Sequence, residues 1–310
     1  MLPLVPKTWI GAGGWGYFSG GLAAYARGFG FVEVNATFYR HASEATARRW
    51  RAAVPAEFTF SVKVHRDVTH RAALHPTPSA RAAFARSART ARLLRAPFLI
   101  LEAPESVPLA REALGGLREL AAMVPDHCRL GLEARAHAER PLPPAARAVL
   151  EGLGVLDVVD RTRSEPRIEQ DTVYTRIFGK GEHNVYELDD EELRSLDRVR
   201  GDARAVAYAF HGVRMYKDAA RLLTFRRTGS FPPATGSVGL ASLAEVLAPD
   251  ARFPADRESL VREHGWKVVD VTPERRDHAT VFLARLPKGT YRDLEGVLEA
   301  LGGSGPSANR

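Results

Sequence analysis

The chain has 310 residues, of which 45% are hydrophobic and 26% are charged, and it contains one cysteine, Cys128. These proportions are typical of a globular protein that buries a sizeable core. No apolar run approaches the roughly 18 residues of a membrane span, and residues 1–7 lack the basic and apolar regions of a secretory signal. The composition excludes an internal disulfide and favours a cytoplasmic protein with no membrane partner.

The formal net charge is +7 and the sequence pI is about 9.7. Arginine dominates, since only six of the 44 basic residues are lysine. The planar guanidinium group suits phosphate, so this excess favours an anionic partner such as DNA or RNA. The arginines are scattered along the chain, however, and an arginine-rich composition without a functional cause explains them equally well.

Short β-rich runs alternate with amphipathic segments along the first 225 residues. The predicted strands are 8–12, 30–35, 57–64, 98–102, 129–135, 155–159, 172–178 and 205–210. The predicted helices are 44–54, 79–94, 107–123, 144–153, 189–199 and 215–225. Ser43 is a plausible N-cap for the helix 44–54, whereas no full helix is expected after the sixth strand. Repeated β-then-α units predict a parallel sheet, and eight of them predict an α/β fold with a closed (β/α)₈ TIM-barrel-like architecture.

Three further segments, 236–247, 258–271 and 291–301, follow the eighth unit. We expect a barrel domain over residues 1–235 and an α/β extension over 236–301 that packs on the barrel, because the extension is short for a large core of its own. The Gly- and Ser-rich residues 302–310 are expected to form a disordered tail.

The run 31–39 is the most informative stretch of the chain. Glu33, Asn35 and Thr37 are polar and alternate with apolar residues, and a period of two predicts a strand with one polar face. A carboxylate in a buried strand is costly unless something pairs with it. Glu33 is therefore expected to face a polar interior.

In TIM barrels the side chains at the C-terminal ends of the strands point into the mouth, where the active site lies. The polar face of each predicted strand gives the candidates for this mouth. They are Glu33, Asn35, Ser61, Lys63, His65, Glu102, Glu133, Arg135, Arg176 and His211, with Trp15, Thr37, Tyr39, His70 and Lys180 in adjoining loops. Opposite charges this close shift pKa values and can form an acid, a base or an electrostatic clamp. The alternative is a layer of ion pairs that fills the barrel without doing chemistry.

Histidines and carboxylates at strand ends are also metal ligands. The candidates are Glu33, His65, His70, Glu102, Glu133 and His211. They show no metal-ligand spacing, and Lys63 and Arg135 would repel a cation. Both observations weigh against a metal, but the ligand types are present and a divalent metal stays open as a cofactor.

Three weaker patterns point to other chemistry at the mouth. Gly179-Lys180-Gly181 follows the seventh strand, where barrels often hold phosphate, although such a turn is often only a turn. The loop aromatics, including Trp15 and Tyr39, either stack on bases or sugars or close the barrel top. Lys63, if desolvated beside Arg135, has the surroundings of a Schiff-base nucleophile, but a charged partner for the carboxylates is the simpler interpretation.

Several blocks of the chain resemble the YecE-like family, which is named as a domain of unknown function. They are residues 10–15, 25–26, 32–39, 58–63, 69–70 and 133–135, and residues 176–184 and 210–216 are similar to its archaeal branch. The resemblance implies a TIM-barrel-like fold, similar to that of endonuclease IV-type repair enzymes, and hence nucleic acid as a candidate partner. Glu102 departs from the glutamine that many relatives have at the end of the fourth strand. The resemblance implies no settled activity.

The leading hypothesis is a hydrolase or lyase that acts on a phosphate-containing substrate, most readily nucleic acid. Glu33 or Glu133 would be the general base, Lys63 and Arg135 would hold developing charge, and His70 would act as acid or ligand. The other candidates would bind the substrate: Trp15, Asn35, Thr37, Tyr39, His65, Arg176, Lys180 and His211. Two alternatives remain, a sugar-phosphate isomerase or aldolase and a nucleic-acid-binding protein without catalysis.

Overall fold

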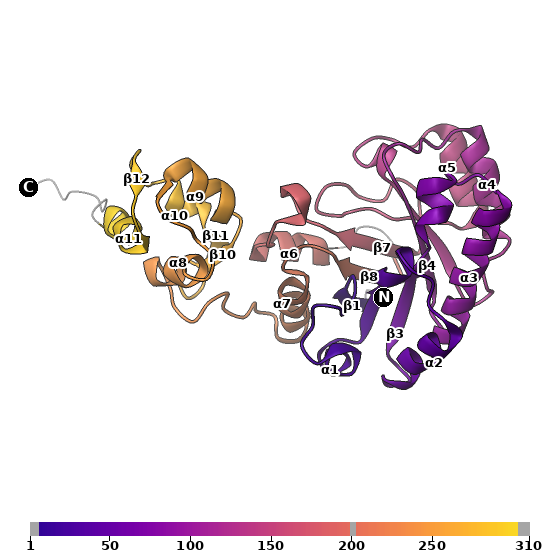
Figure 1. The fold of residues 1–310 in the computed structure, drawn as a ribbon, viewed down its shortest axis with the longest axis horizontal. Coiled ribbons are helices and arrows are strands. Elements are labelled where there is room, and N and C mark those ends of the chain that lie inside the picture. Colours follow the sequence, from indigo (N-terminus) through magenta and orange to yellow (C-terminus); the bar gives the residue numbers. More distant parts are fainter. Residues whose placement is uncertain (1–5, 199–202, 303–310) are drawn as a thin grey trace, which may run out of the picture. The chain divides into compact units, whose positions relative to one another are not determined.

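The computed structural model describes residues 6–198 and 203–302 (Figure 1). Most of the tail expected at 302–310 lies outside these residues. None of the described helices has the length and apolar character needed to cross a membrane. Eight parallel strands form one sheet in the order β6-β5-β4-β3-β2-β1-β8-β7. The strands are β1 (Lys7–Ala12), β2 (Phe31–Val34), β3 (Thr59–Lys63), β4 (Phe98–Ala103), β5 (Arg129–Ala134), β6 (Leu156–Asp157), β7 (Thr172–Ile177) and β8 (Ala205–Phe210).

The two ends of this sheet meet. Val159, just after β6, forms a parallel bridge with Thr175 in β7, and its carbonyl oxygen accepts a hydrogen bond from the Arg176 amide at 3.1 Å. The sheet is thereby nearly closed, and the α/β barrel that the sequence predicts is confirmed.

Helices follow most of the strands, and those within the first 153 residues lie on the outside of the sheet (Figure 1). They are α1 (Gly21–Gly28), α2 (Glu44–Ala52), α3 (Pro78–Leu94), α4 (Arg111–Ala121), α5 (Pro144–Leu153), α6 (Asp190–Asp197) and α7 (Met215–Thr228). Ser43 caps α2 as predicted, because its hydroxyl accepts a hydrogen bond from the Thr46 amide at 3.1 Å. No helix lies between β6 and β7 in this described part of the chain, which agrees with the weak sixth unit in the sequence.

The second strand is shorter than the alternation suggests. β2 ends at Val34, and Asn35–Phe38 form a 3₁₀ turn, η1. The expectation that the polar alternation continues as a strand beyond Val34 is therefore wrong. Thr37 explains the change, because its hydroxyl lies 2.6 Å from the carbonyl oxygen of Val34 and 2.7 Å from that of Lys63 and holds the turn against the end of β3.

The inside of the barrel is filled in layers. The lower layer is apolar and aromatic, and includes Phe31, Phe98, Ile100, Leu156 and Tyr174. One inward position further along the strands, the residues become charged: Glu33 follows Phe31, and Arg176 follows Tyr174. The polar layer therefore lies at the C-terminal ends of the strands, on a dry floor of packed side chains.

The described residues divide into two compact units. The first runs to Phe178 and includes β8 and Met215–Ala220, and the second comprises Gly179–Arg198, Gly212–Arg214 and the chain from Arg221. The later elements are α8 (Leu240–Leu247), β9 (Ala255–Asp256), α9 (Arg257–His264), β10 (Val268–Asp270), β11 (Arg276–His278), α10 (Thr280–Leu283), β12 (Thr290–Tyr291) and α11 (Leu294–Gly302). They enclose a hydrophobic core that includes Leu243, Leu247, Leu260, Leu283 and Val297. The segment expected as an extension thus has a core of its own.

The close approach of β1 and β2 depends on Gly11. A Cβ atom at this position would lie 1.9 Å from the carbonyl oxygen of Phe31, which is main chain and cannot move aside. We expect Gly11→Ala to lower the free energy of unfolding by about 3 kcal/mol in urea titrations. Gly28→Ala, where a Cβ would meet nothing within 4 Å, is the control and should leave stability unchanged or slightly raised. Equal effects of the two variants would contradict this account of the β1–β2 contact.

Candidate functional site

Five strands each contribute one charged side chain to a single layer at the barrel mouth. They are Glu33 from β2, Lys63 from β3, Glu102 from β4, Glu133 from β5 and Arg176 from β7, and all five are buried. Alternation along each strand turns these side chains inward, and the stagger of the closed sheet brings them together, since Glu33 is level with Ser61 and Lys63 with Ile100.

Arg176 lies at the centre of this charged layer and is only 1% exposed. Its guanidinium Nη2 lies 3.1 Å from Glu33 Oε1, and its Nη1 lies 2.5 Å from Glu102 Oε2. The same Nη1 also pairs with Glu133. Three carboxylates around one guanidinium raise the pKa of Arg176, even though burial alone would lower it.

Glu33 is the most enclosed carboxylate. It accepts a hydrogen bond from the Tyr174 hydroxyl at 2.9 Å, and His211 Nε2 lies 3.2 Å from its Oε1 without hydrogen-bond geometry. Burial alone would raise the pKa of Glu33, but the charge of Arg176 and the neighbouring His211 and Lys63 outweigh it and hold the pKa well below its usual range. Glu33 is therefore a fixed negative charge at neutral pH and a weak proton acceptor.

Lys63 is the cation whose pKa moves toward neutrality. Its ammonium nitrogen lies 2.8 Å from Glu102 Oε2 and 3.8 Å from the centre of the Phe38 ring. Burial and the charge of Arg176 lower the pKa of Lys63 to about 8, although Glu102 and Glu33 oppose them. A fraction of Lys63 is consequently neutral near physiological pH, which suits it to proton transfer or nucleophilic attack.

Arg135 and His70 form the outer edge of the charged layer. Arg135 follows β5 in the short turn η3 (Arg135–His137), and it lies 2.9 Å from Glu133 and 3.0 Å from Glu102 with its side chain 35% exposed. His70 Nε2 lies 3.9 Å from Glu102 Oε1, in the turn η2 (Asp67–Arg71). Burial lowers the pKa of His70, so it is neutral at pH 7. These two side chains are the most exposed of the cluster.

The remaining candidates lie at varied distances from this cluster. His65 is buried and stacks on His41, with ring centres 4.0 Å apart, and the Thr37 hydroxyl is occupied by main-chain carbonyl oxygens. Asn35 has a buried side-chain oxygen for which the described residues provide no hydrogen-bond partner. Lys180 belongs to the second compact unit, where it lies 2.9 Å from Glu192.

Three residues near the charged layer are not predicted from the sequence. Tyr174 binds both Glu33 and Ser61, whose oxygen lies 2.6 Å from the Tyr174 hydroxyl. Phe178 stacks on His211, with ring centres 4.9 Å apart. Asp160, after β6, accepts hydrogen bonds from the Phe178 amide and from Thr162, and burial raises its pKa. Alternation with Arg176 could have found Tyr174, but a tyrosine in a strand also fits an ordinary core position.

The mouth has few of the features of a metal site. Its carboxylates face guanidinium and ammonium groups, which balance them charge for charge. Among the residues described, the ligand atoms of one group of three lie within 4.8 Å of one another, and this group belongs to the second unit. It consists of Asp189, Glu192 and His278, which are also engaged in the cap of α6 and in the ion pair with Lys180.

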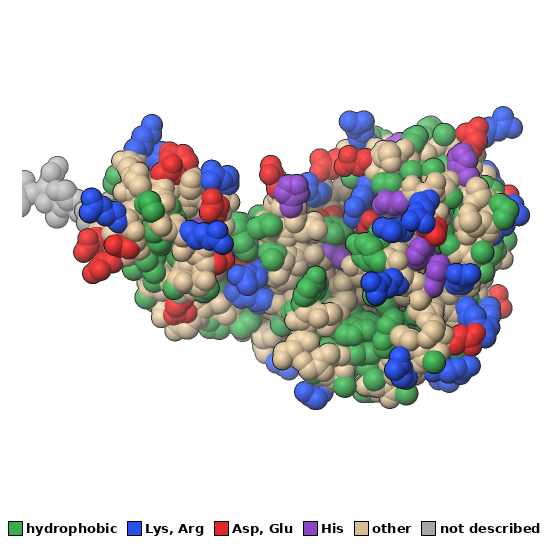
Figure 2. Space-filling model, in the orientation of Figure 1, with side chains coloured by type: hydrophobic (Ala, Val, Ile, Leu, Met, Phe, Trp, Pro, Cys, Tyr) green, Lys and Arg blue, Asp and Glu red, His purple; other side chains and the backbone are tan. Residues whose placement is uncertain are grey.

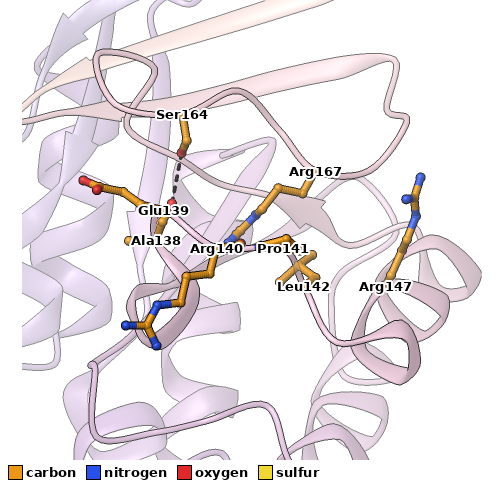
Figure 3. Close-up of a pocket in the computed structure, with 8 residues that line it drawn as sticks. All are labelled: Ala138, Glu139, Arg140, Pro141, Leu142, Arg147, Ser164 and Arg167. Carbon is orange, nitrogen blue, oxygen red and sulfur yellow. Dashed lines mark hydrogen bonds between the residues drawn. The ribbon is translucent and has the colours of Figure 1, made fainter.

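Each compact unit also contains a hollow. In the barrel, a pocket of about 320 Å³ lies beside α5 and is bordered by Arg140, Arg147 and Arg167 (Figure 3). Arg167 is bound to Asp157 and Arg147 to Glu151, whereas no described carboxylate pairs with Arg140. In the second unit, a groove of about 810 Å³ is lined by residues that include Tyr186, Trp266 and His278.

The net positive charge of the chain comes from residues 1–178. Residues 1–178 contain 24 Lys and Arg against 17 Asp and Glu, a formal net charge of +7, whereas residues 179–310 contain 20 of each. Figure 2 shows Lys, Arg and His side chains gathered on the visible face of the barrel, with fewer Asp and Glu among them. The ion-paired layer is balanced, so the excess lies outside it.

The fold and the mouth thus define a (β/α)₈-barrel protein with a buried ion-paired layer at the C-terminal ends of its strands. The sequence matches the family described as "Protein of unknown function DUF72" over residues 16–227. The chain belongs to this family, which is the one that the sequence blocks indicate. None of the curated proteins compared with the chain matches it.

Solved structures of the family agree with the barrel. A DUF72 family protein from Enterococcus faecalis V583 superposes with a TM-score of 0.59 at 14% identity, over 72% of this chain and 98% of its own. One from Thermotoga maritima MSB8 superposes with a TM-score of 0.54 at 19% identity, over 71% and 98%. Endonuclease IV from Thermus thermophilus has a TM-score of 0.45 at 14% identity, over 72% and 98%, a likeness too low to support an argument. At these identities the comparison concerns fold alone.

Removal of one buried carboxylate should destabilise the barrel strongly. Glu33→Gln removes one of the negative charges that balance the buried guanidinium of Arg176. We expect this substitution to lower the free energy of unfolding by about 3–5 kcal/mol in urea titrations. Glu151→Gln removes a half-exposed partner of Arg147 and should change stability by less than about 1 kcal/mol. A small effect of Glu33→Gln would show that the layer contributes little to folding.

Acid should weaken the same layer. Burial alone would raise the pKa of Glu102, but Arg176, Lys63 and Arg135 outweigh it and lower the pKa to about 2. The folded pKa lies below the unfolded one, so the stabilisation is complete above pH 4.5 and is lost as the pH falls through 2. We expect a loss of about 3 kcal/mol over this interval, measured by urea titrations at several pH values. In Glu102→Gln the acid-dependent loss should be smaller by about this amount, and an unchanged pH profile would contradict the pairing.

Proposed function

We propose that the barrel mouth binds a phosphate-containing substrate, with nucleic acid as the leading candidate, and cleaves it as a hydrolase or lyase. The single observation that carries this proposal is Lys63, whose pKa is lowered to about 8 beside a set of fixed charges at the mouth. A lysine with a neutral fraction at physiological pH is a proton acceptor, and such groups occur mainly at functional sites.

Charge supports an anionic substrate. The net charge of +7 over residues 1–178 attracts phosphate, and Arg135 presents a partly exposed guanidinium at the edge of the layer. A guanidinium holds two phosphate oxygens at once, which both positions the substrate and stabilises charge that develops on it. His70, neutral and partly exposed, is a hydrogen-bond partner on the same edge.

The proton transfer is assigned to Lys63 rather than to Glu33. Glu33 is held charged by Arg176 and is bound by Tyr174, so it has little affinity for a proton at neutral pH. Neutral Lys63 would take a proton from water or from the substrate and pass to the ammonium form, which Glu102 at 2.8 Å then stabilises. Glu33 and Arg176 act in this scheme as fixed charges that help to set the pKa of Lys63.

The same lysine favours a second candidate function, an isomerase or aldolase acting on a phosphorylated sugar. A buried amine near neutrality also attacks a carbonyl carbon and forms a Schiff base with loss of water. Borohydride would reduce that adduct and fix the substrate carbon to Lys63. Covalent mass at Lys63 after incubation with sugar phosphates and borohydride would favour this second function over nucleic-acid cleavage.

Lys63→Arg separates binding from catalysis at the mouth. Arginine keeps the positive charge but does not lose its proton near pH 8, so binding should persist while cleavage falls by about 100- to 10,000-fold. Cleavage of labelled DNA and RNA oligonucleotides by the unaltered protein should rise with pH and level off above about 8, because the neutral amine is the active form.

The matched control is Lys7→Arg, which alters an exposed lysine at the start of β1 and should leave the cleavage rate unchanged. Binding without any cleavage by the unaltered protein would favour the non-catalytic alternative. Absence of binding to DNA and RNA at low salt would overturn the nucleic-acid assignment.

A further inference from the structure

Two tyrosines stand out on the surface of the barrel. Tyr17 is 92% exposed and Tyr39 is 56% exposed, and they are the exposed aromatic residues among the large hydrophobic side chains described. Tyr17 lies in the loop after β1 and Tyr39 in the segment after β2, and these strands are neighbours in the sheet. Both loops leave the C-terminal ends of their strands, which is the end that carries the charged layer.

The loop that bears Tyr17 is firmly anchored on both sides of that residue. Trp15 packs edge-on against Trp50, with ring centres 5.3 Å apart, and Phe18 packs in the same way against Tyr216 at 5.1 Å. The Phe18 amide donates a hydrogen bond to the Trp15 carbonyl oxygen at 3.0 Å, which closes a turn around Tyr17. The neighbouring rings pack against other side chains of the barrel, whereas the Tyr17 side chain is exposed to solvent.

Tyr39 packs on Phe38, a residue that also contacts Lys63 of the charged layer. Its ring packs edge-on against Phe38 at 5.0 Å, and Phe38 in turn lies beneath the Lys63 ammonium and against His70. The next residue, Arg40, is exposed and pairs with no carboxylate among the described residues. An aromatic ring and an exposed guanidinium therefore follow one another in the chain, directly after the residue whose ring contacts the Lys63 ammonium group.

We infer that the mouth takes single-stranded nucleic acid, with unpaired bases stacked on Tyr17 and Tyr39 and phosphates held by Arg40 and Arg135. This inference rests on the proposed function and specifies its substrate. Tyrosine side chains have few rotatable bonds and lose little freedom when a base stacks on them, and a stacked base requires a strand whose bases are not already paired. The positive charge of the barrel supplies the complementary attraction for the backbone.

Stacking and charge can be separated by their response to salt. We expect fluorescence anisotropy to show tighter binding of labelled single strands of about 15 nucleotides than of the matching duplexes. Tyr17→Ala and Tyr39→Ala should each weaken single-strand binding by about 5- to 100-fold, by the same factor at every salt concentration. Arg40→Ala should instead reduce the slope of log K against log salt by roughly 0.7.

The controls keep the surface otherwise intact. Tyr17→Phe and Tyr39→Phe retain the rings and should retain binding, and Leu153→Ala removes an exposed apolar side chain at the end of α5 and should have no effect. Equal affinity for duplex and single strand, or unaltered binding in both alanine variants, would overturn the inference and leave the proposed function standing. Loss of self-association in the alanine variants, with unchanged oligonucleotide binding, would assign the rings to a protein interface instead. Absence of any nucleic-acid binding would remove the proposed function and this inference together.

Discussion

The burial of Arg176 is the constraint on which the barrel mouth depends. A guanidinium that is 1% exposed is very unfavourable in a dry interior unless carboxylates surround it, and three carboxylates so close together would repel one another without it. Its partners Glu33, Glu102 and Glu133 are separated from it by 143, 74 and 43 residues in the chain. The cluster therefore forms only when the strands have closed in the correct register, because a slip of one residue would turn Arg176 to the other face.

This balance also limits the chemistry of the site. The three carboxylates are matched by Arg176, Lys63 and Arg135, so the layer offers a cation little net attraction. Glu33 and Glu102, whose pKa values are held low, act as fixed charges. Within this layer, Lys63 is the group that combines burial, a ring beneath its ammonium group and a pKa near neutrality. Lys63 is therefore the group of this layer best suited to proton transfer, which is why we propose the reactive role there.

The sequence predicts the location of this layer better than its pairing. Alternation along short strands is a local property, so the inward phase of Glu33, Lys63 and Arg176 could be predicted from neighbouring residues. Which carboxylate meets which cation depends on register across the closed sheet, and no local pattern encodes it. Two residues illustrate the limit. The sequence predicts Thr37 as a polar residue of the mouth, and its hydroxyl binds main-chain carbonyl oxygens. The sequence also makes Lys180 a candidate phosphate ligand, and in the structure Lys180 pairs with Glu192.

In the function that we propose, exposed side chains attract the substrate and the buried layer holds the reactive group. Because Arg135 completes the charge balance of the ion-paired layer, the excess positive charge of residues 1–178 lies outside that layer, and the exposed Arg40 belongs to that excess. Exposed rings at Tyr17 and Tyr39 add a contact that salt does not screen, and Phe38 connects one of them directly to Lys63. A ligand drawn in by charge and held by stacking would thus meet Lys63 without disturbing the ion pairs that keep the barrel closed. In the function that we propose, substrate binding rests mainly on exposed side chains and the stability of the barrel on Arg176 and its carboxylates, while Arg135 serves both.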